Sequence, residues 1–325
     1  MKFKYVILFL LLTTICQAQI AKRKYYGALL EPKHGVLHGA GQDSLGFLEY
    51  VGAVEKNQHP IIYMTYINLL NKEKLADYGN YLTTLLQGLP DDVIPQIGLS
   101  FVVGKDKGLG QDKAVAEGLY DENIQLLVDA LQKFNCPVFI RIGYEFEGGW
   151  NGYKPESYKA TFVKIAKAIK EAKLKVATVW CSGGSPVPLS KLMEYYPGDE
   201  WVDWWGVDIF SPNQMTFPTL FEFLKAADSH KKPMMIGEST PRGIGVHDGT
   251  KSWEQWYKPY FELIYNNPQI KAFCYINWDL AYWSDKLGFP WHNWKDARIQ
   301  LNDTVKENYK MQLRSKLFIH SKNTK

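Results

Sequence analysis

Hydrophobic residues along the chain gather into short, almost continuous apolar runs that alternate with amphipathic segments. Runs of this kind are typical of strands that are buried on both faces of a parallel sheet. The strands that they predict are Tyr25–Leu30, Ile61–Tyr66, Ile94–Phe101, Val138–Tyr144, Val176–Trp180, Trp204–Ile209, Pro233–Gly237 and Ala272–Trp278.

The segments between these runs have helical periodicity. In one of them the apolar residues recur at steps of three and four, which places them on one helix face. They are Tyr158, Phe162, Ile165, Ile169 and Ala172. Strands alternating with helices indicate βαβ units, and repetition over most of the chain favours a single-domain (β/α)8 barrel. The competing doubly wound open sheet normally has a glycine-rich turn after its first strand, where this sequence reads LLEPKHG.

The first 18 residues have the features of a secretory signal peptide. Lys2 and Lys4 precede the apolar run Tyr5–Leu12, and Ala18 ends a small-residue cleavage site. The run is shorter than the ~20 residues that a membrane span needs. We therefore expect a secreted or periplasmic protein without a membrane span, in which residues 1–18 are removed and 19–325 form one domain. Lipoprotein anchoring at Cys16 is the alternative.

Composition narrows the function classes. A net charge of +4, from 38 basic and 34 acidic residues, is too balanced to favour a nucleic-acid partner. The 11 Trp, 20 Tyr and 16 Phe residues either fill a core or offer flat faces to sugar rings. After the predicted cleavage Cys136, Cys181 and Cys274 remain, each in an apolar run, and we expect them to be buried free thiols.

Acidic residues end two of the predicted strands, and barrel active sites lie at the C-terminal ends of strands. Glu145 follows the fourth strand and Glu238 ends the seventh. Because side chains alternate along a strand, Arg141 and Glu145 are expected to point into the barrel mouth. The same alternation directs Ile142 and Tyr144 toward the surrounding helices.

The two glutamates are 93 positions apart, which equals three βα units of about 31 residues. Their strands should therefore face each other across the mouth. Two carboxyl groups ~5–5.5 Å apart can hydrolyse a glycosidic bond by double displacement, one as acid and the other as nucleophile. Arg141 is the expected partner that keeps one carboxylate ionised, and Asp208 is a third carboxylate on the rim. Glu147 competes with Glu145 for the acid role.

Three stretches resemble the sequence of a known enzyme family. They are Tyr144–Trp150, the run YPGDEWVDWWGVD at 196–208, and Ile236–Glu238. Together they resemble glycoside hydrolase family 26, which belongs to a clan of retaining (β/α)8 glycosidases. That family includes β-mannanases and some β-1,3-xylanases.

The resemblance implies a role for individual residues. Glu145 corresponds to the acid/base and Glu238 to the nucleophile. Trp150 and Trp278 correspond to aromatic walls that stack on the reacting sugar. The implied reaction needs no cofactor or metal, and its partner is a β-linked polysaccharide or oligosaccharide of the mannan or xylan type.

Three positions depart from the family pattern. Tyr144 stands where the family typically has His, Glu147 where it has Asn, and Phe210 where it has Tyr. These positions surround the reacting sugar, so they bear on which glycan is bound. A carbohydrate-binding barrel without catalysis and an exo-acting glycosidase of the same clan therefore remain alternatives to the predicted retaining hydrolase.

A histidine pair and three tryptophans give weaker signals. His34 and His38 are four residues apart among several glycines, which favours a loop after the first strand. We expect this loop to line the cleft, with His38 as a substrate contact and no metal site. Trp283, Trp291 and Trp294 follow the last strand and either pack on the barrel or line further sugar subsites.

Overall fold

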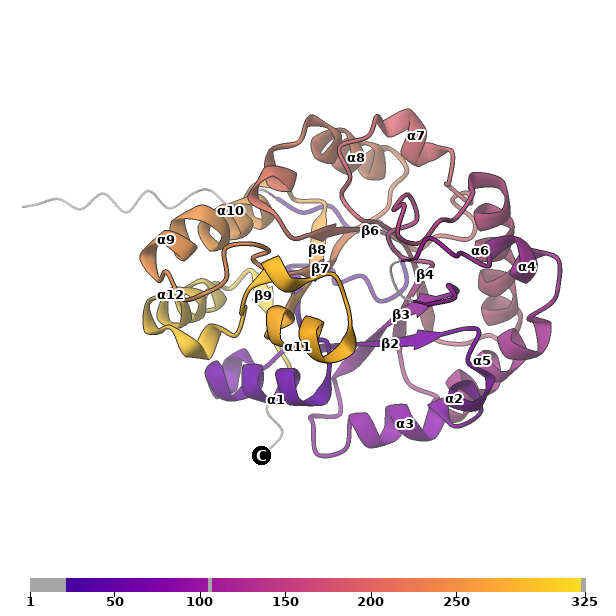
Figure 1. Ribbon diagram of the computed structural model, residues 1–325, viewed down its shortest axis with the longest axis horizontal. Coiled ribbons are helices and arrows are strands. Elements are labelled where there is room, and N and C mark those ends of the chain that lie inside the picture. Colours follow the sequence, from indigo (N-terminus) through magenta and orange to yellow (C-terminus); the bar gives the residue numbers. More distant parts are fainter. Residues whose placement is uncertain (1–21, 105–106, 323–325) are drawn as a thin grey trace, which may run out of the picture.

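The computed structural model describes residues 22–104 and 107–322, which form a closed barrel of parallel strands surrounded by helices (Figure 1). Neighbouring strands follow the order β2-β3-β4-β5-β6-β7-β8-β1, and β1 pairs again with β2 to close the ring. The barrel strands are β1 Val36–Gly41, β2 Ile62–Asn68, β3 Ile94–Ser100, β4 Val138–Ile142, β5 Val176–Ser182, β6 Trp204–Ile209, β7 Met234–Ser239 and β8 Ile270–Ile276. The predicted (β/α)8 fold is confirmed.

Helices lie between successive strands and cover the outside of the barrel (Figure 1). They are α1 Ser44–Ala53, α2 Lys72–Ala76, α3 Tyr78–Leu85, α4 Asp112–Ala116, α5 Asp121–Phe134, α6 Pro155–Glu171, α7 Leu189–Met193, α8 Pro218–Ser229, α9 Thr250–Ser252, α10 Lys258–Asn266, α11 Leu280–Leu287 and α12 Asp303–Leu313. A short strand, β9 Phe318–Ile319, pairs with the start of β1. None of the described helices combines the length and apolar character needed to cross a bilayer.

The hydrophobic core has two layers, as expected for strands buried on both faces. The outer layer lies between strands and helices, and in α6 it includes the predicted residues Tyr158, Phe162 and Ile165. The inner layer fills the barrel and includes Phe139 and Met64. The inner layer therefore forms a packed floor beneath the barrel mouth.

The predicted first strand is wrong. Tyr25–Leu30 is not a strand, and its end packs at the base of the barrel, where Trp204 Nε1 donates to Leu29 O at 2.8 Å. The first strand is β1, whose glycines hide its apolar character in the sequence. They are needed because a Cβ at Gly39 would lie 2.5 Å from Cys274 Sγ, and one at Gly41 2.7 Å from Met64 Cβ.

His38 consequently lies within β1 and not in a loop beside the cleft. Its side chain is fully buried, with Nε2 2.6 Å from Tyr50 Oη and Nδ1 3.0 Å from His320 Nδ1. A buried imidazole with both nitrogens engaged cannot reach a sugar, so the predicted substrate contact by His38 is wrong.

The cysteine prediction is correct for two of three residues. Cys181 and Cys274 are buried and free, whereas Cys136 is free but exposed, because it lies in the turn before β4 and not within the strand. The predicted signal peptide and Cys16 lie outside the described residues.

Candidate active site

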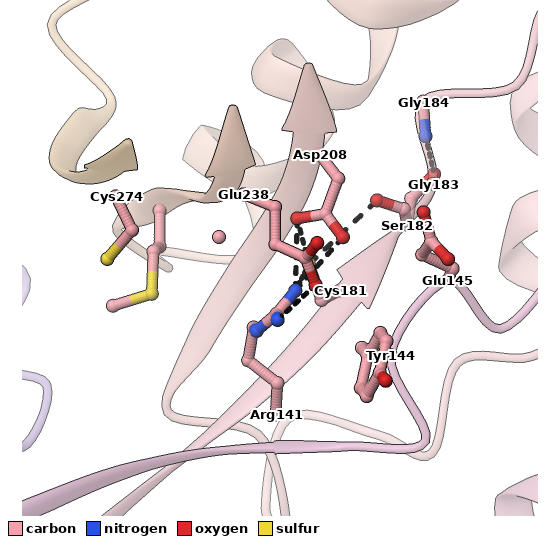
Figure 2. Close-up of polar contacts among 12 residues, drawn as sticks. Arg141, Tyr144, Glu145, Cys181, Ser182, Gly183, Gly184, Asp208, Glu238 and Cys274 are labelled. Atoms are coloured by element: carbon pink, nitrogen blue, oxygen red, sulfur yellow. Dashed lines mark hydrogen bonds and ion pairs between the residues drawn. The ribbon is translucent and has the colours of Figure 1, made fainter. Parts of the chain in front are cut away.

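A buried arginine organises the barrel mouth. Arg141, on β4, donates through Nη1 to both oxygens of Asp208, at 3.1 and 2.9 Å. Its Nη2 donates to Glu238 Oε1 at 2.5 Å. Figure 2 shows both carboxylates directed at this one guanidinium from β6 and β7. The predicted meeting of strands four and seven across the barrel is confirmed, as is the position of Asp208 on the inner rim.

Glu238 reaches the barrel interior through an irregularity in β7. Val207 pairs with Ile236 but Ile209 pairs with Ser239, so two residues of β7 oppose one residue of β6. Such a bulge turns a side chain to the other face of the sheet. Ile236 packs in the outer layer, and without the bulge Glu238 would follow it outward.

The residue before Glu238 has to be glycine. A Cβ at Gly237 would lie 2.8 Å from Asp208 Oδ1 and 2.9 Å from Arg141 Cδ. Gly237 also offers its carbonyl oxygen to Gln96 Nε2 on β3, at 3.1 Å. The bulge therefore leaves room for the ion cluster and is held in place from across the barrel.

Glu145 sits on a tight turn just beyond the end of β4. Gly143 and Glu145 both have left-handed backbone conformations, with φ of 57° and 52°. The turn is fixed by the Glu145 amide, which donates to Cys181 O at 2.8 Å, and by Asn151, whose Nδ2 donates to Glu145 O at 3.1 Å. A strained conformation of a non-glycine residue persists only when its surroundings hold it, and it is common in active sites.

The same turn corrects the predicted orientation of Tyr144. Because β4 ends at Ile142, the alternation of side chains stops there and Tyr144 turns inward, whereas Ile142 packs in the outer layer as expected. The Arg141 guanidinium lies 4.6 Å from the centre of the Tyr144 ring. Tyr66 on β2 lies beside it, with ring centres 5.7 Å apart. Two tyrosines thus form an aromatic wall next to the ion cluster.

The surroundings raise the proton affinity of two carboxyl groups. Desolvation raises the pKa of Glu145 well above its usual value, and repulsion by Asp208 and Glu238 adds to this effect, while the Trp150 N–H opposes it. Burial raises the pKa of Asp208 to about 8, against the opposing pull of Arg141. A carboxyl group whose pKa is raised in this way has the property required of a general acid.

Glu147, the competitor of Glu145, is engaged elsewhere. Its carboxylate accepts hydrogen bonds from Ser182 Oγ at 2.7 Å and from the amides of Gly183 and Ser185 at 3.2 and 3.3 Å. These bonds tie the loop after β5 to the Glu145 turn. Glu147 is therefore held by the loop after β5, whereas Glu145 has Trp150 Nε1 as its one hydrogen-bond donor among the described residues.

The two predicted aromatic walls differ in exposure. Trp150 is 38% exposed, and its Nε1 donates to Glu145 Oε2 at 2.7 Å. Trp278 is 8% exposed and stacks on Trp283, with ring centres 5.3 Å apart. Its buried Nε1 has no hydrogen-bond partner among the described residues. An unpaired buried donor at the mouth suits a ligand rich in hydroxyl groups.

The long segment after β8 packs on the barrel. Phe210 is buried and contacts Trp294, with ring centres 4.9 Å apart. Trp283, Trp291 and Trp294 are each half-buried against the inner layer. The structure thus brings them to the mouth, where they keep partly exposed faces.

Two contributors to the site were not singled out in the sequence. Gln96 fixes the β7 bulge and Tyr66 completes the aromatic wall. Gln96 interrupts the apolar run Ile94–Phe101, and a polar residue within a buried strand is a signal that could have found it. Tyr66 ends its predicted strand with nothing to distinguish it from a core aromatic.

A parallel (β/α)8 barrel with acidic side chains gathered at the C-terminal ends of its strands is an architecture typical of enzymes. Paired glutamates from two of those strands are the groups that glycoside hydrolases use. The fold and the arrangement of these carboxyl groups are therefore of the kind found in barrel hydrolases.

Comparison with known proteins identifies the family that this chain resembles. Residues 113–273 match the model of glycosyl hydrolase family 26. The chain is 29% identical to a β-1,3-xylanase from an Alcaligenes species, over 90% of this chain and 66% of that protein. It is also 29% identical to a β-1,3-xylanase from a Vibrio species, over 89% of this chain and 67% of that protein. The chain thus spans about two thirds of the length of these relatives.

Solved structures agree in fold. A family 26 β-mannanase from Bacteroides ovatus superposes with a TM-score of 0.59 at 17% identity, covering 90% of this chain and 92% of that one. A family 26 protein from a Muricauda species gives a TM-score of 0.67 at 12% identity, covering 90% and 88%. The resemblance to family 26 is confirmed, and the comparisons support a glycosidase.

Proposed function

We propose that the protein is a retaining glycoside hydrolase that cleaves a β-linked polysaccharide or oligosaccharide, with Glu145 as acid/base and Glu238 as nucleophile. The observation behind this proposal is the division of roles around Arg141. Glu238 forms an ion pair with the buried guanidinium, while Glu145 is not bonded to it and its pKa is raised. One ionised and one protonated carboxyl group are what double displacement requires.

In the first step the Glu145 carboxyl group donates its proton to the glycosidic oxygen while a Glu238 oxygen attacks the anomeric carbon. The bond from that carbon to the glycosidic oxygen breaks, and the leaving sugar departs as an alcohol. In the second step the Glu145 carboxylate takes a proton from water, whose oxygen attacks the same carbon and releases Glu238. Two inversions retain the configuration.

The substrate class rests on the relatives and on the aromatic rim. The curated relatives are β-1,3-xylanases, and mannanases share the fold. A β-xylan is therefore our first candidate and a β-mannan the second. Trp150 offers an exposed indole ring to a sugar, and Trp278 offers an unpaired N–H donor. Secretion or periplasmic export through residues 1–18 remains a proposal, as does catalysis by the single domain 19–325.

The test is a screen of purified protein on β-1,3-xylan, β-1,4-xylan, mannan and mixed-linkage glucan, with Glu238→Ala beside the wild type. We expect the wild type to cleave one of them, with retention of anomeric configuration in the first product by NMR, and Glu238→Ala to be inactive. Comparable activity of Glu238→Ala, or an inverted first product, would refute the proposal. Saturable glycan binding without any turnover would instead identify a non-catalytic carbohydrate-binding barrel.

A further inference from the structure

One arginine at the barrel mouth has no acceptor for its guanidinium within residues 22–104 and 107–322. Arg242 follows the candidate nucleophile Glu238 by four residues and its side chain is exposed. No described residue forms an ion pair with it or accepts a hydrogen bond from its guanidinium. The other arginines, Arg23, Arg141, Arg298 and Arg314, donate to carbonyl oxygens or pair with carboxylates.

The guanidinium is nevertheless held in one place. It lies 4.7 Å from the centre of the Trp294 ring, and Trp294 itself packs on Phe210. The Arg242 amide donates to Phe210 O at 3.0 Å, and the next amide, of Gly243, donates to Trp294 O at 3.2 Å. A cation stacked on an indole keeps its N–H groups directed outward and loses little freedom when it binds a ligand.

The partner ring is also fixed. Trp294 lies in the segment between β8 and α12, whose two ends meet in an antiparallel bridge between Asp279 and Asp296. Arg298 pairs with both of these carboxylates, at 3.5 and 2.6 Å. The acidic side chains that anchor this segment are therefore already neutralised by Arg298, and neither pairs with Arg242.

We infer that Arg242, stacked on Trp294, is a specificity site for an anionic substituent on the glycan, a carboxylate of a uronic acid or a sulfate ester. A planar guanidinium binds both groups through two parallel hydrogen bonds. Arg242 follows the end of β7 and contacts Trp294, so it lies on the same rim of the barrel as Glu238. The inference deepens the proposed function, on which its catalytic meaning rests.

Binding measurements test the inference separately from turnover. The probes are xylohexaose, the same oligosaccharide with a glucuronic acid branch, and a sulfated form, titrated by calorimetry into the Glu145→Gln protein to slow cleavage. We expect at least one acidic probe to bind about tenfold more tightly than the neutral one, and increasing salt to reduce this preference. The acidic probe that is preferred identifies the substituent.

Substitutions test whether Arg242 causes the preference for acidic probes. In the Glu145→Gln background, Arg242→Gln should abolish the preference and leave neutral binding unchanged, and Arg242→Lys should retain part of it. The control Arg314→Gln removes another exposed arginine, which pairs with Glu55, and should change nothing. Equal binding of all probes, or a preference that survives Arg242→Gln, would overturn the inference. Preferential acidic binding without turnover of any glycan would refute the proposed hydrolase and leave this site standing.

Discussion

The barrel buries a cluster of charges at each end, and the two clusters are balanced differently. At the base, Lys271 pairs with Glu31 at 2.9 Å, and both side chains are fully buried. The second oxygen of Glu31 accepts three backbone N–H groups, from residues 26 to 28, at 2.9, 2.8 and 3.1 Å. Lys271 also donates to Pro32 O. The charges of Lys271 and Glu31 therefore balance each other, and backbone groups provide further hydrogen bonds to both side chains.

At the mouth, one cation is surrounded by three carboxyl groups. Arg141 pairs with Asp208 and Glu238, and Glu145 stands near both without a cation of its own. Excess negative charge raises proton affinity, and perturbed acids of this kind are concentrated at functional sites. We therefore propose that the base cluster serves stability and that the mouth cluster serves catalysis.

The largest expected effect comes from Glu238→Gln. The substitution keeps the shape of the side chain but removes the nucleophile, so kcat/KM should fall by at least about ten-thousandfold. Stability should be unchanged or increased, because one of the negative charges around Arg141 is lost. Thermal unfolding and initial rates measure both quantities. The control is Glu222→Gln, at an exposed position on α8, which should change neither the thermal unfolding nor kcat/KM. A destabilised but active Glu238→Gln protein would assign this residue to structure.

Glu145→Gln should lower kcat/KM on a natural glycan by about a hundred- to ten-thousandfold, because the leaving oxygen is no longer protonated. An aryl glycoside with an acidic phenol as leaving group needs no such help, so its first step should be far less affected. Initial rates on both substrates give the comparison. Equal losses on both would mean that Glu145 is not the acid.

Breaking the base cluster should affect folding and not catalysis. Lys271→Met leaves Glu31 buried without its cation, which should reduce the free energy of unfolding by about 3–5 kcal/mol. The folded fraction should keep the wild-type kcat. Chemical denaturation and activity at low temperature measure the two effects, and Lys225→Met on the exposed side of α8 is the matched control. A loss of kcat in fully folded Lys271→Met protein would contradict the proposal that the base cluster contributes to stability and not to catalysis.

The smallest expected effect is a shift in pH dependence. As a general acid Glu145 must be protonated, so activity is lost as the pH rises through its pKa. The Trp150 N–H stabilises the carboxylate and lowers that pKa. Trp150→Phe keeps an aromatic face but removes the donor, so the alkaline limb of kcat/KM should move up by about one pH unit. A downward shift would show that Trp150 acts on a different group.

The sequence was sufficient for features that rest on periodicity. Apolar runs located seven of the barrel strands, and strand-end acids located Glu145, Glu238 and Asp208. It was not sufficient where glycines interrupt a pattern. The glycines of β1 concealed the first strand, and this error also misplaced His38.

Backbone irregularities were equally invisible in the sequence. A strict alternation of side chains predicts Tyr144 among the helices, but the left-handed turn after Ile142 directs it inward. The β7 bulge that brings Glu238 into the mouth depends on pairing with β6, a contact between residues far apart in the chain. Local patterns predict the residues of the site, whereas these turns and bulges decide where the residues point.

The most direct test of the account is covalent trapping with a 2-fluoroglycoside of the sugar that the glycan screen identifies. The fluorine slows both steps, and an activated leaving group such as dinitrophenolate keeps the first step fast enough for the glycosyl group to accumulate on the nucleophile. Peptide mass spectrometry should then find one label, on Glu238, and none in Glu238→Gln protein. A label on Glu145 or Asp208, or cleavage of the glycan with no label at any carboxylate, would contradict the central claim that Arg141 holds Glu238 as the attacking group.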